Sequence, residues 1–164
     1  ISPGFDDLDR TSSISFTRNF TTSAVPNSEG NIIIDIDGTT SGLYDTLTCN
    51  SFVTLGGTLT LRVGNSYFPV NGDRISFITS PRDIAGQFSN ITSPRGWHVE
   101  YFQNRTDAVY CSADFNSDGV IDFFDYLDFV SAFSANHPDA DFNFDSTIDF
   151  FDYLDFVAAF SSGC

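Results

Sequence analysis

Apolar and polar residues alternate in short runs through the first 110 residues of this chain. Runs such as 32–36, 58–63 and 74–78 place side chains of opposite character on the two faces of an extended backbone. Turn residues separate the runs at intervals of roughly eight to twelve positions. The pattern predicts an all-β N-terminal domain over residues 1–110, either a β-sandwich of the jelly-roll type or, alternatively, a short β-helix.

Further strands are predicted at residues 52–55, 97–102 and 108–110. Gly56 and Gly57 lie between the first of these and residues 58–63, so we expect two strands about a glycine turn.

Residues 1–22 contain a short alternating piece, Ser13 to Thr17. It predicts the first strand of the same domain. The alternative is that residues 1–22 form an extended, exchangeable segment that adds to the sheet edge of a neighbouring subunit.

The pattern changes to a helical period after Asp122. One stripe of the first predicted helix consists of Phe123, Tyr126, Leu127, Val130 and Phe133, and the second helix repeats it with Phe150, Tyr153, Leu154, Val157 and Phe160. Two short helices cannot easily cover so many aromatic rings by packing on each other. Either the helices fill a core with the preceding domain, or they present an aromatic patch to a partner protein. The candidate partner-binding residues are Phe123, Phe124, Phe129, Phe150, Phe151 and Phe156.

Both helices belong to a sequence that occurs twice. Residues 114–133 return at 141–160 with four differences. In each copy, oxygen-bearing side chains occupy the first, third, fifth, ninth and twelfth places, namely Asp114, Asn116, Asp118, Asp122 and Asp125, then Asp141, Asn143, Asp145, Asp149 and Asp152.

This spacing is typical of loops that bind a hard cation, because a tight turn can aim alternate oxygens at one point. The seventh residue, Val120 or Thr147, would contribute its backbone carbonyl, and the ninth would reach the ion through water. The sequence therefore predicts two Ca²⁺ ions, one in each loop. Ser146 replaces the glycine of the first loop, so we expect weaker binding there. The alternative is a solvated acidic helix face that binds nothing.

The charge is distributed unevenly over the 164 residues. The net charge is −15, and residues 111–164 contribute −11 of it through eleven aspartates without any Lys or Arg. A basic footprint for nucleic acid is therefore absent. No apolar run approaches the roughly twenty residues needed to cross a bilayer, so we expect no membrane span.

Cys111 and Cys164 bracket the repeats, which predicts a disulfide that closes the module 111–164. Such a loop closure is worth roughly 3–4 kcal/mol in the chain-entropy model. Three separate thiols are the alternative. Cys49 would be a buried small residue. The chain also lacks methionine, and we expect a mature extracellular protein whose signal peptide has been removed.

The repeats and the final Gly-Cys resemble type I dockerins, and they are similar to dockerin-like tails of secreted planctomycete-type bacterial proteins. The resemblance covers residues 111–164, and β-rich segments like residues 44–88 precede such tails. It implies a paired EF-hand-type module, small and α-helical, that joins one protein to another without catalysis. In cellulosome dockerins the two places before the twelfth ligand recognise the partner and are often small and hydroxylated. Here they are Phe123-Phe124 and Phe150-Phe151.

Catalytic motifs are missing from the sequence. His98 and His137 are the only histidines, and neither has metal-ligand spacing to a second histidine or to a cysteine. We expect a non-enzymatic structural protein that self-assembles, through copies of itself, into an extracellular filament or surface layer. The alternative is an anchoring module for a separate cohesin-like receptor, with a β domain that binds carbohydrate or a cell surface. A small hydrolase is the third alternative.

Overall fold

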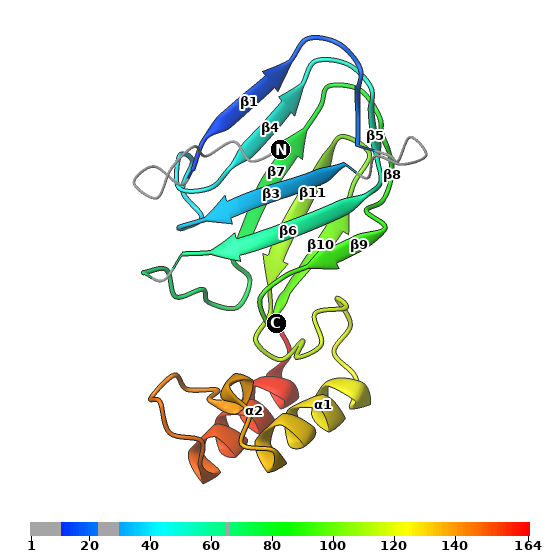
Figure 1. Ribbon diagram of the computed structural model, residues 1–164. Helices are drawn as coiled ribbons and strands as arrows, with labels where there is room; N and C mark the ends of the chain where they lie inside the picture. Colours follow the sequence, from blue (N-terminus) through cyan, green and yellow to red (C-terminus); the bar gives the residue numbers. More distant parts are fainter. Residues whose placement is uncertain (1–10, 23–29, 65) are drawn as a thin grey trace. The chain divides into compact units, whose positions relative to one another are not determined.

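A computed structural model describes residues 11–22, 30–64 and 66–164 of the chain (Figure 1). Its contacts separate two compact units. The first contains the chain up to Pro69, Asp73–Pro94 and Val99–Val109. The second contains Val70–Gly72, Arg95–His98 and Tyr110–Cys164.

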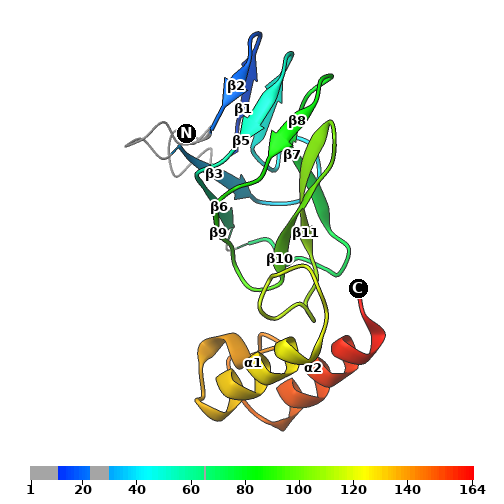
Figure 2. The ribbon, with the colours of Figure 1, turned by 90° about the vertical axis from the view of Figure 1, so that its right-hand side faces the viewer.

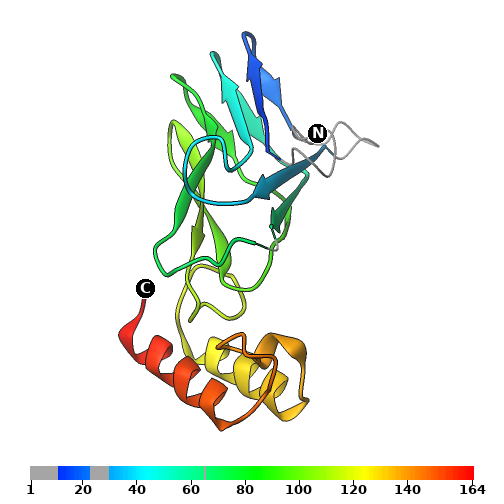
Figure 3. The same cartoon turned by 90° about the vertical axis from the view of Figure 1, so that its left-hand side faces the viewer.

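The β-strands lie wholly or mostly in the first unit, and most of them pair with the strand three places later. The strands are β1 (Ser13–Phe16), β2 (Phe20–Thr21), β3 (Asn31–Ile36), β4 (Thr46–Cys49), β5 (Val53–Leu55), β6 (Thr58–Val63), β7 (Arg74–Thr79), β8 (Ile84–Gly86), β9 (Asn90–Thr92), β10 (Trp97–Tyr101) and β11 (Arg105–Tyr110). They form sheets in the orders β1-β4-β7-β11-β10, β2-β5-β8 and β3-β6-β9. Figures 2 and 3 show these sheets from two opposite sides.

The pairing makes three turns of a parallel β-helix. All six ladders among β1 to β9 are parallel, and β11 then pairs antiparallel with β7. The prediction of a β-sandwich is therefore wrong, because a sandwich is built from two packed antiparallel sheets. The alternative, a short β-helix, is the observed architecture. Short alternating strands with frequent turns occur in both folds, so their pattern does not distinguish the two.

The glycine turn at residues 56–57 is a corner of this helix. The strands on either side of it, β5 and β6, exist as predicted but belong to different sheets. Gly57 has φ of 69°, and a Cβ there would collide with the backbone carbonyl of Gly30. Glycine thus lets the chain turn closely past the preceding turn of the helix.

Apolar ladders form the core of the first unit. Leu47 of β4 lies between Ile14 and Ile78 in register, and Leu59 of β6 lies between Ile32 and Ile91. Leu47, Leu59, Ile32 and Ile78 are all at most 2% exposed. Each such buried aliphatic side chain contributes about 1.5–3 kcal/mol relative to an exposed one, so the stacked turns stabilise each other.

The first strand lies in the sheet of its own chain. β1 pairs with β4 over Ser13–Phe16, and the Ser13 and Thr46 hydroxyls are 2.6 Å apart. The alternating piece is therefore a strand of its own domain, as predicted. Residues 1–10 lie outside the described residues, so the exchangeable segment stays a prediction for them.

A buried acidic group anchors the entry to β1. Asp45 is fully buried, and its carboxylate accepts hydrogen bonds from the backbone N–H groups of Ser12, at 2.6 Å, and of Asp35, at 3.0 Å. Asp35 in turn forms a bidentate ion pair with Arg62. Burial raises the pKa of Asp45 to about 6, although both N–H groups oppose the shift.

The second unit contains two helices with a core of their own. The helices are α1 (Phe123–Ser134) and α2 (Phe150–Ser162), with a short 3₁₀ turn, η1 (Pro138–Ala140), between them. Phe129 and Phe156 are 0% exposed at its centre. The side chains packed around them include Phe115, Tyr126, Val130, Phe133, Phe142, Ile148, Tyr153, Val157 and Phe160.

This core corrects part of the predicted partner surface. Phe129 and Phe156 cannot contact another protein, because they are the most buried rings of the helix pair. The predicted stripe is also displaced, since Leu127 and Leu154 are exposed. Packing of the two helices on each other therefore buries more aromatic rings than the sequence pattern predicted. Among the described residues, no helix is both long and apolar enough to cross a membrane.

Candidate metal centre

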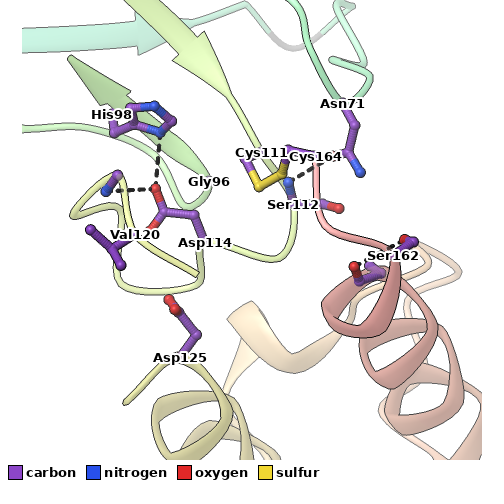
Figure 4. Close-up of a disulfide and its surroundings, with 12 residues drawn as sticks. Asn71, Gly96, His98, Cys111, Ser112, Asp114, Val120, Asp125, Ser162 and Cys164 are labelled. Carbon is purple, nitrogen blue, oxygen red and sulfur yellow. Dashed lines mark hydrogen bonds and ion pairs between the residues drawn. A yellow bond between two sulfur atoms is a disulfide. The ribbon is translucent and has the colours of Figure 1, made fainter. Parts of the chain in front are cut away.

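The first loop folds around its own side-chain oxygens. The two carboxylate oxygens of Asp114 accept hydrogen bonds from the N–H groups of Asp118 and Gly119, at 3.0 and 2.9 Å. Asn116 accepts from Asp118 at 3.0 Å, and Asp118 accepts from Val120 at 2.8 Å. The first, third and fifth side chains of the loop therefore all accept hydrogen bonds from the loop's own backbone (Figure 4 shows Asp114).

The second loop repeats this arrangement bond for bond. Asp141 accepts from Asp145 and Ser146 at 3.1 and 3.0 Å, Asn143 accepts from Asp145 at 2.9 Å, and Asp145 accepts from Thr147 at 2.8 Å. Identical spacing in the sequence thus gives identical local geometry.

The fourth and sixth residues of each loop have left-handed backbone. Ser117 and Gly119 have φ of 62° and 86°, and Phe144 and Ser146 have φ of 60° and 71°. The second loop therefore makes the same turn as the first, although serine stands there in place of glycine. Ser146 adopts it at a cost of order 1–3 kcal/mol.

The twelfth residues tie each loop to the start of a helix. Asp125 and Asp152 are 0% exposed. Asp125 accepts from Asn116 and Asp122, at 3.1 and 2.9 Å, while Asp152 accepts from Phe142, Asn143 and Asp149, at 2.7, 3.2 and 2.8 Å. Burial by itself would raise the pKa of Asp152, but these backbone N–H groups outweigh it and lower that pKa. The carboxylate is thus held in its charged form.

The ninth residues serve as helix caps. Asp122 and Asp149 each accept a hydrogen bond at 2.8 Å from the second residue of the following helix. Together with Asp125 and Asp152 they form capping boxes at both helix starts. The role of the ninth residues toward an ion, through water, stays a prediction.

The donor set fits a hard cation. Within the described residues, no three His, Cys, Asp or Glu side chains stand together as a ready metal site. The loops, however, also offer amide and carbonyl oxygens as ligands. Their carboxylates accept hydrogen bonds from N–H groups of the same loop. Neither Asp125 nor Asp152 forms an ion pair with Lys or Arg in the part of the chain that the structure describes, although the Arg95 guanidinium attracts Asp152 electrostatically. Buried charged carboxylates normally require a cation, and all-oxygen ligands favour Ca²⁺ over softer metals.

A distant segment, Arg95–His98, also contacts the loops within the second unit. His98 Nδ1 lies 2.9 Å from a carboxylate oxygen of Asp114, as Figure 4 shows, and the Gly96 N–H donates to the Ser117 hydroxyl at 3.0 Å. A Cβ on Gly119 would lie 3.2 Å from the ring of His98. The sequence pattern missed this segment, since no motif connects it to the repeats.

Four of the six predicted partner-binding rings are exposed. Phe123, Phe124, Phe150 and Phe151 are 62–66% exposed. Phe123 stacks on Tyr126 and Phe150 on Tyr153, with ring centroids 6.0 and 6.1 Å apart. We call these four residues the paired-Phe surface. Its two halves occupy equivalent positions in the two repeats.

The predicted disulfide is confirmed. Cys111 and Cys164 are bonded, with Cα atoms 5.5 Å apart, and they join the two ends of the repeat region (Figure 4). Cys49 is free and buried, with its thiol 3.2 Å from the Arg18 carbonyl oxygen.

Comparison of the chain with protein-family models, with curated proteins and with solved structures found no significant match.

Proposed function

We propose that the second unit is a dockerin-like module that binds two Ca²⁺ ions. The ligands would be Asp114, Asn116, Asp118, Asp125 and the Val120 carbonyl in one loop, and Asp141, Asn143, Asp145, Asp152 and the Thr147 carbonyl in the other. Asp122 and Asp149 would act through water. Each ion would supply the positive charge that the grouped carboxylates lack.

The observation that carries this proposal is the burial of Asp125 and Asp152. Both carboxylates are 0% exposed, and their described contacts are N–H groups of the loops and of the helix starts. They occupy the place where a calcium loop closes on its helix.

We further propose that the chain is a secreted, non-enzymatic structural protein that assembles with copies of itself. The paired-Phe surface supports a protein partner, because large exposed aromatic side chains are often found on binding surfaces. A chain with one β unit and one such module has two different surfaces, as head-to-tail polymers require. The disulfide supports an oxidising, extracellular setting.

The second candidate function is docking on a separate cohesin-like receptor. The two equivalent halves of the paired-Phe surface favour it equally, because one module would offer the same pair of rings twice to such a receptor.

Sedimentation of the full chain tests both calcium binding and self-assembly. In millimolar calcium we expect large particles that dissolve after excess chelator. The double variant Asp125→Asn, Asp152→Asn should stay small in calcium. Its matched control is Asp128→Asn, Asp155→Asn, which removes two exposed carboxylates from the same helices and should assemble. A chain that binds calcium but stays monomeric would favour docking on a separate receptor over self-assembly. A chain that does not respond to calcium would refute the proposed calcium-binding module.

A further inference from the structure

The second unit holds one arginine, and that side chain lies between the two loops. All residues of this unit are described, and Arg95 is the single Lys or Arg among them. Its guanidinium carbon lies 5.2 Å from the ring centroid of Phe115, 4.9 Å from that of Phe142 and 5.6 Å from that of Phe144. Phe115 belongs to the first loop, and the other two rings belong to the second.

Two of the four titratable groups that attract Arg95 belong to the second loop. These groups are, from the largest effect to the smallest, Tyr110, Asp139, Asp141 and Asp152. Burial has the larger effect and lowers the pKa of Arg95. Asp141 and Asp152 are the first and twelfth residues of the second loop, so the guanidinium attracts two of the proposed calcium ligands.

The contacts of this segment also account for two of the four differences between the repeats. Ser117 of the first loop accepts the Gly96 N–H, whereas its counterpart Phe144 lies against the Arg95 guanidinium. Gly119 leaves room for the ring of His98, whereas Ser146 occupies the same place in the second loop. The repeats therefore differ where the segment Arg95–His98 contacts each of them differently.

We propose that Arg95 is a clasp that holds the two loops together when calcium is scarce. The inference rests on the proposed function in taking the loops as calcium ligands. A guanidinium that is partly shielded from water is attracted to aromatic faces more strongly than an exposed one. Three rings from the two loops lie around this guanidinium. A loop pair assembled in advance binds its ions without having to order first.

Thermal unfolding of the full chain in excess chelator tests the clasp. Trp97 is the single tryptophan, is 1% exposed and lies two residues from Arg95, so its fluorescence reports on this region, while helical circular dichroism reports on α1 and α2. We expect Arg95→Met to lower the unfolding midpoint of the helical signal, and Arg95→Lys, which keeps the charge, to lower it less. The matched control, Arg82→Met, alters an exposed arginine of the first unit and should leave the midpoint unchanged.

A calcium titration extends the test. Arg95→Met should weaken calcium binding by about tenfold, because the cost of ordering the loops outweighs the loss of repulsion between the guanidinium and the ion. Calcium binding that is unchanged or tighter would contradict the clasp. If Arg95→Met does not fold, Phe144→Ser replaces it. That ring is 61% exposed, and its loss should shift the chelated midpoint in the same direction by a smaller amount.

Equal midpoints for Arg95→Met and Arg82→Met in chelator would overturn the clasp. If Arg95→Met does not fold, an unchanged unfolding midpoint for Phe144→Ser in chelator would overturn the clasp instead. A wild-type chain that binds no calcium would instead refute the proposed function, while the melts in chelator would still decide the role of Arg95.

Discussion

The rings of Phe129 and Phe156 stack with their centroids 4.0 Å apart and their planes 7° from parallel. They occupy equivalent positions in the two repeats, so the two helices pack through the same phenylalanine of each repeat. Phe115 and Phe142, one from each loop, meet Phe156 edge-on. The loops and the helices thus share one core, and a change in either is expected to affect the other.

The first prediction concerns this stack. Phe129→Ala should destabilise the helix pair by about 3–5 kcal/mol, because it removes a fully buried ring and leaves a cavity. The control, Phe124→Ala, removes a ring of the same helix that is 66% exposed and should cost less than about 0.5 kcal/mol. Urea unfolding followed by helical circular dichroism measures both. Similar losses for the two variants would contradict the observed core.

The second prediction concerns the loop turns. Ser146→Gly should stabilise the second loop by about 1 kcal/mol and tighten its calcium binding, because glycine adopts φ of 71° without strain. The reverse exchange, Gly119→Ser, should weaken the first loop, since its Cβ would also press on His98. Calorimetric titration with calcium resolves the two steps. Tighter binding by Gly119→Ser would contradict the assignment of strain to this position.

The third prediction concerns the disulfide. The double variant Cys111→Ser, Cys164→Ser should lower the free energy of unfolding of the second unit by about 4 kcal/mol, because the unfolded chain regains the freedom of a long loop. Cys49→Ser provides the comparison, since that thiol is free. A reducing agent should reproduce the effect of the double variant in the wild type and have no effect in the variant itself. Unfolding curves that coincide with and without reductant in the wild type would contradict the prediction.

The fourth prediction concerns pH. Asp45 has a pKa of about 6 in the folded chain against an ordinary value of 3.8, so the folded state binds the proton more tightly than the unfolded state. Its contribution to stability is fully present below about pH 4 and is lost as the pH rises through about 6. Asp45→Asn keeps an oxygen acceptor but does not titrate. The stability of the wild type relative to this variant should therefore fall between pH 4 and pH 6 and stay level above.

Unfolding by denaturant at several pH values checks this difference. Charges elsewhere contribute equally to both proteins and cancel. A difference that grows with rising pH would have the wrong sign for a buried acid with a raised pKa.

Local features of this protein were determined by the sequence alone. Most hydrogen bonds within the loops join residues two to five places apart, as Asp118 and Asp114 show, so they depend on local residue spacing. The two helices follow from their capping aspartates and period, and the disulfide from cysteines at both ends of the repeats. The loop and helix predictions needed no knowledge of distant partners, and the disulfide is a long-range contact that the positions of the cysteines alone indicated.

Only the tertiary structure decided which strands pair and what surrounds the loops. Ser13 and Thr46 meet across 33 residues, and nothing in an alternating pattern specifies a parallel partner at that distance rather than an antiparallel neighbour. The same holds for Phe129, whose burial depends on Phe156, and for Arg95, which reaches loops far along the chain. Short-range hydrogen bonding is set by the order of residues, whereas the partners of an apolar or charged side chain depend on how the whole chain packs.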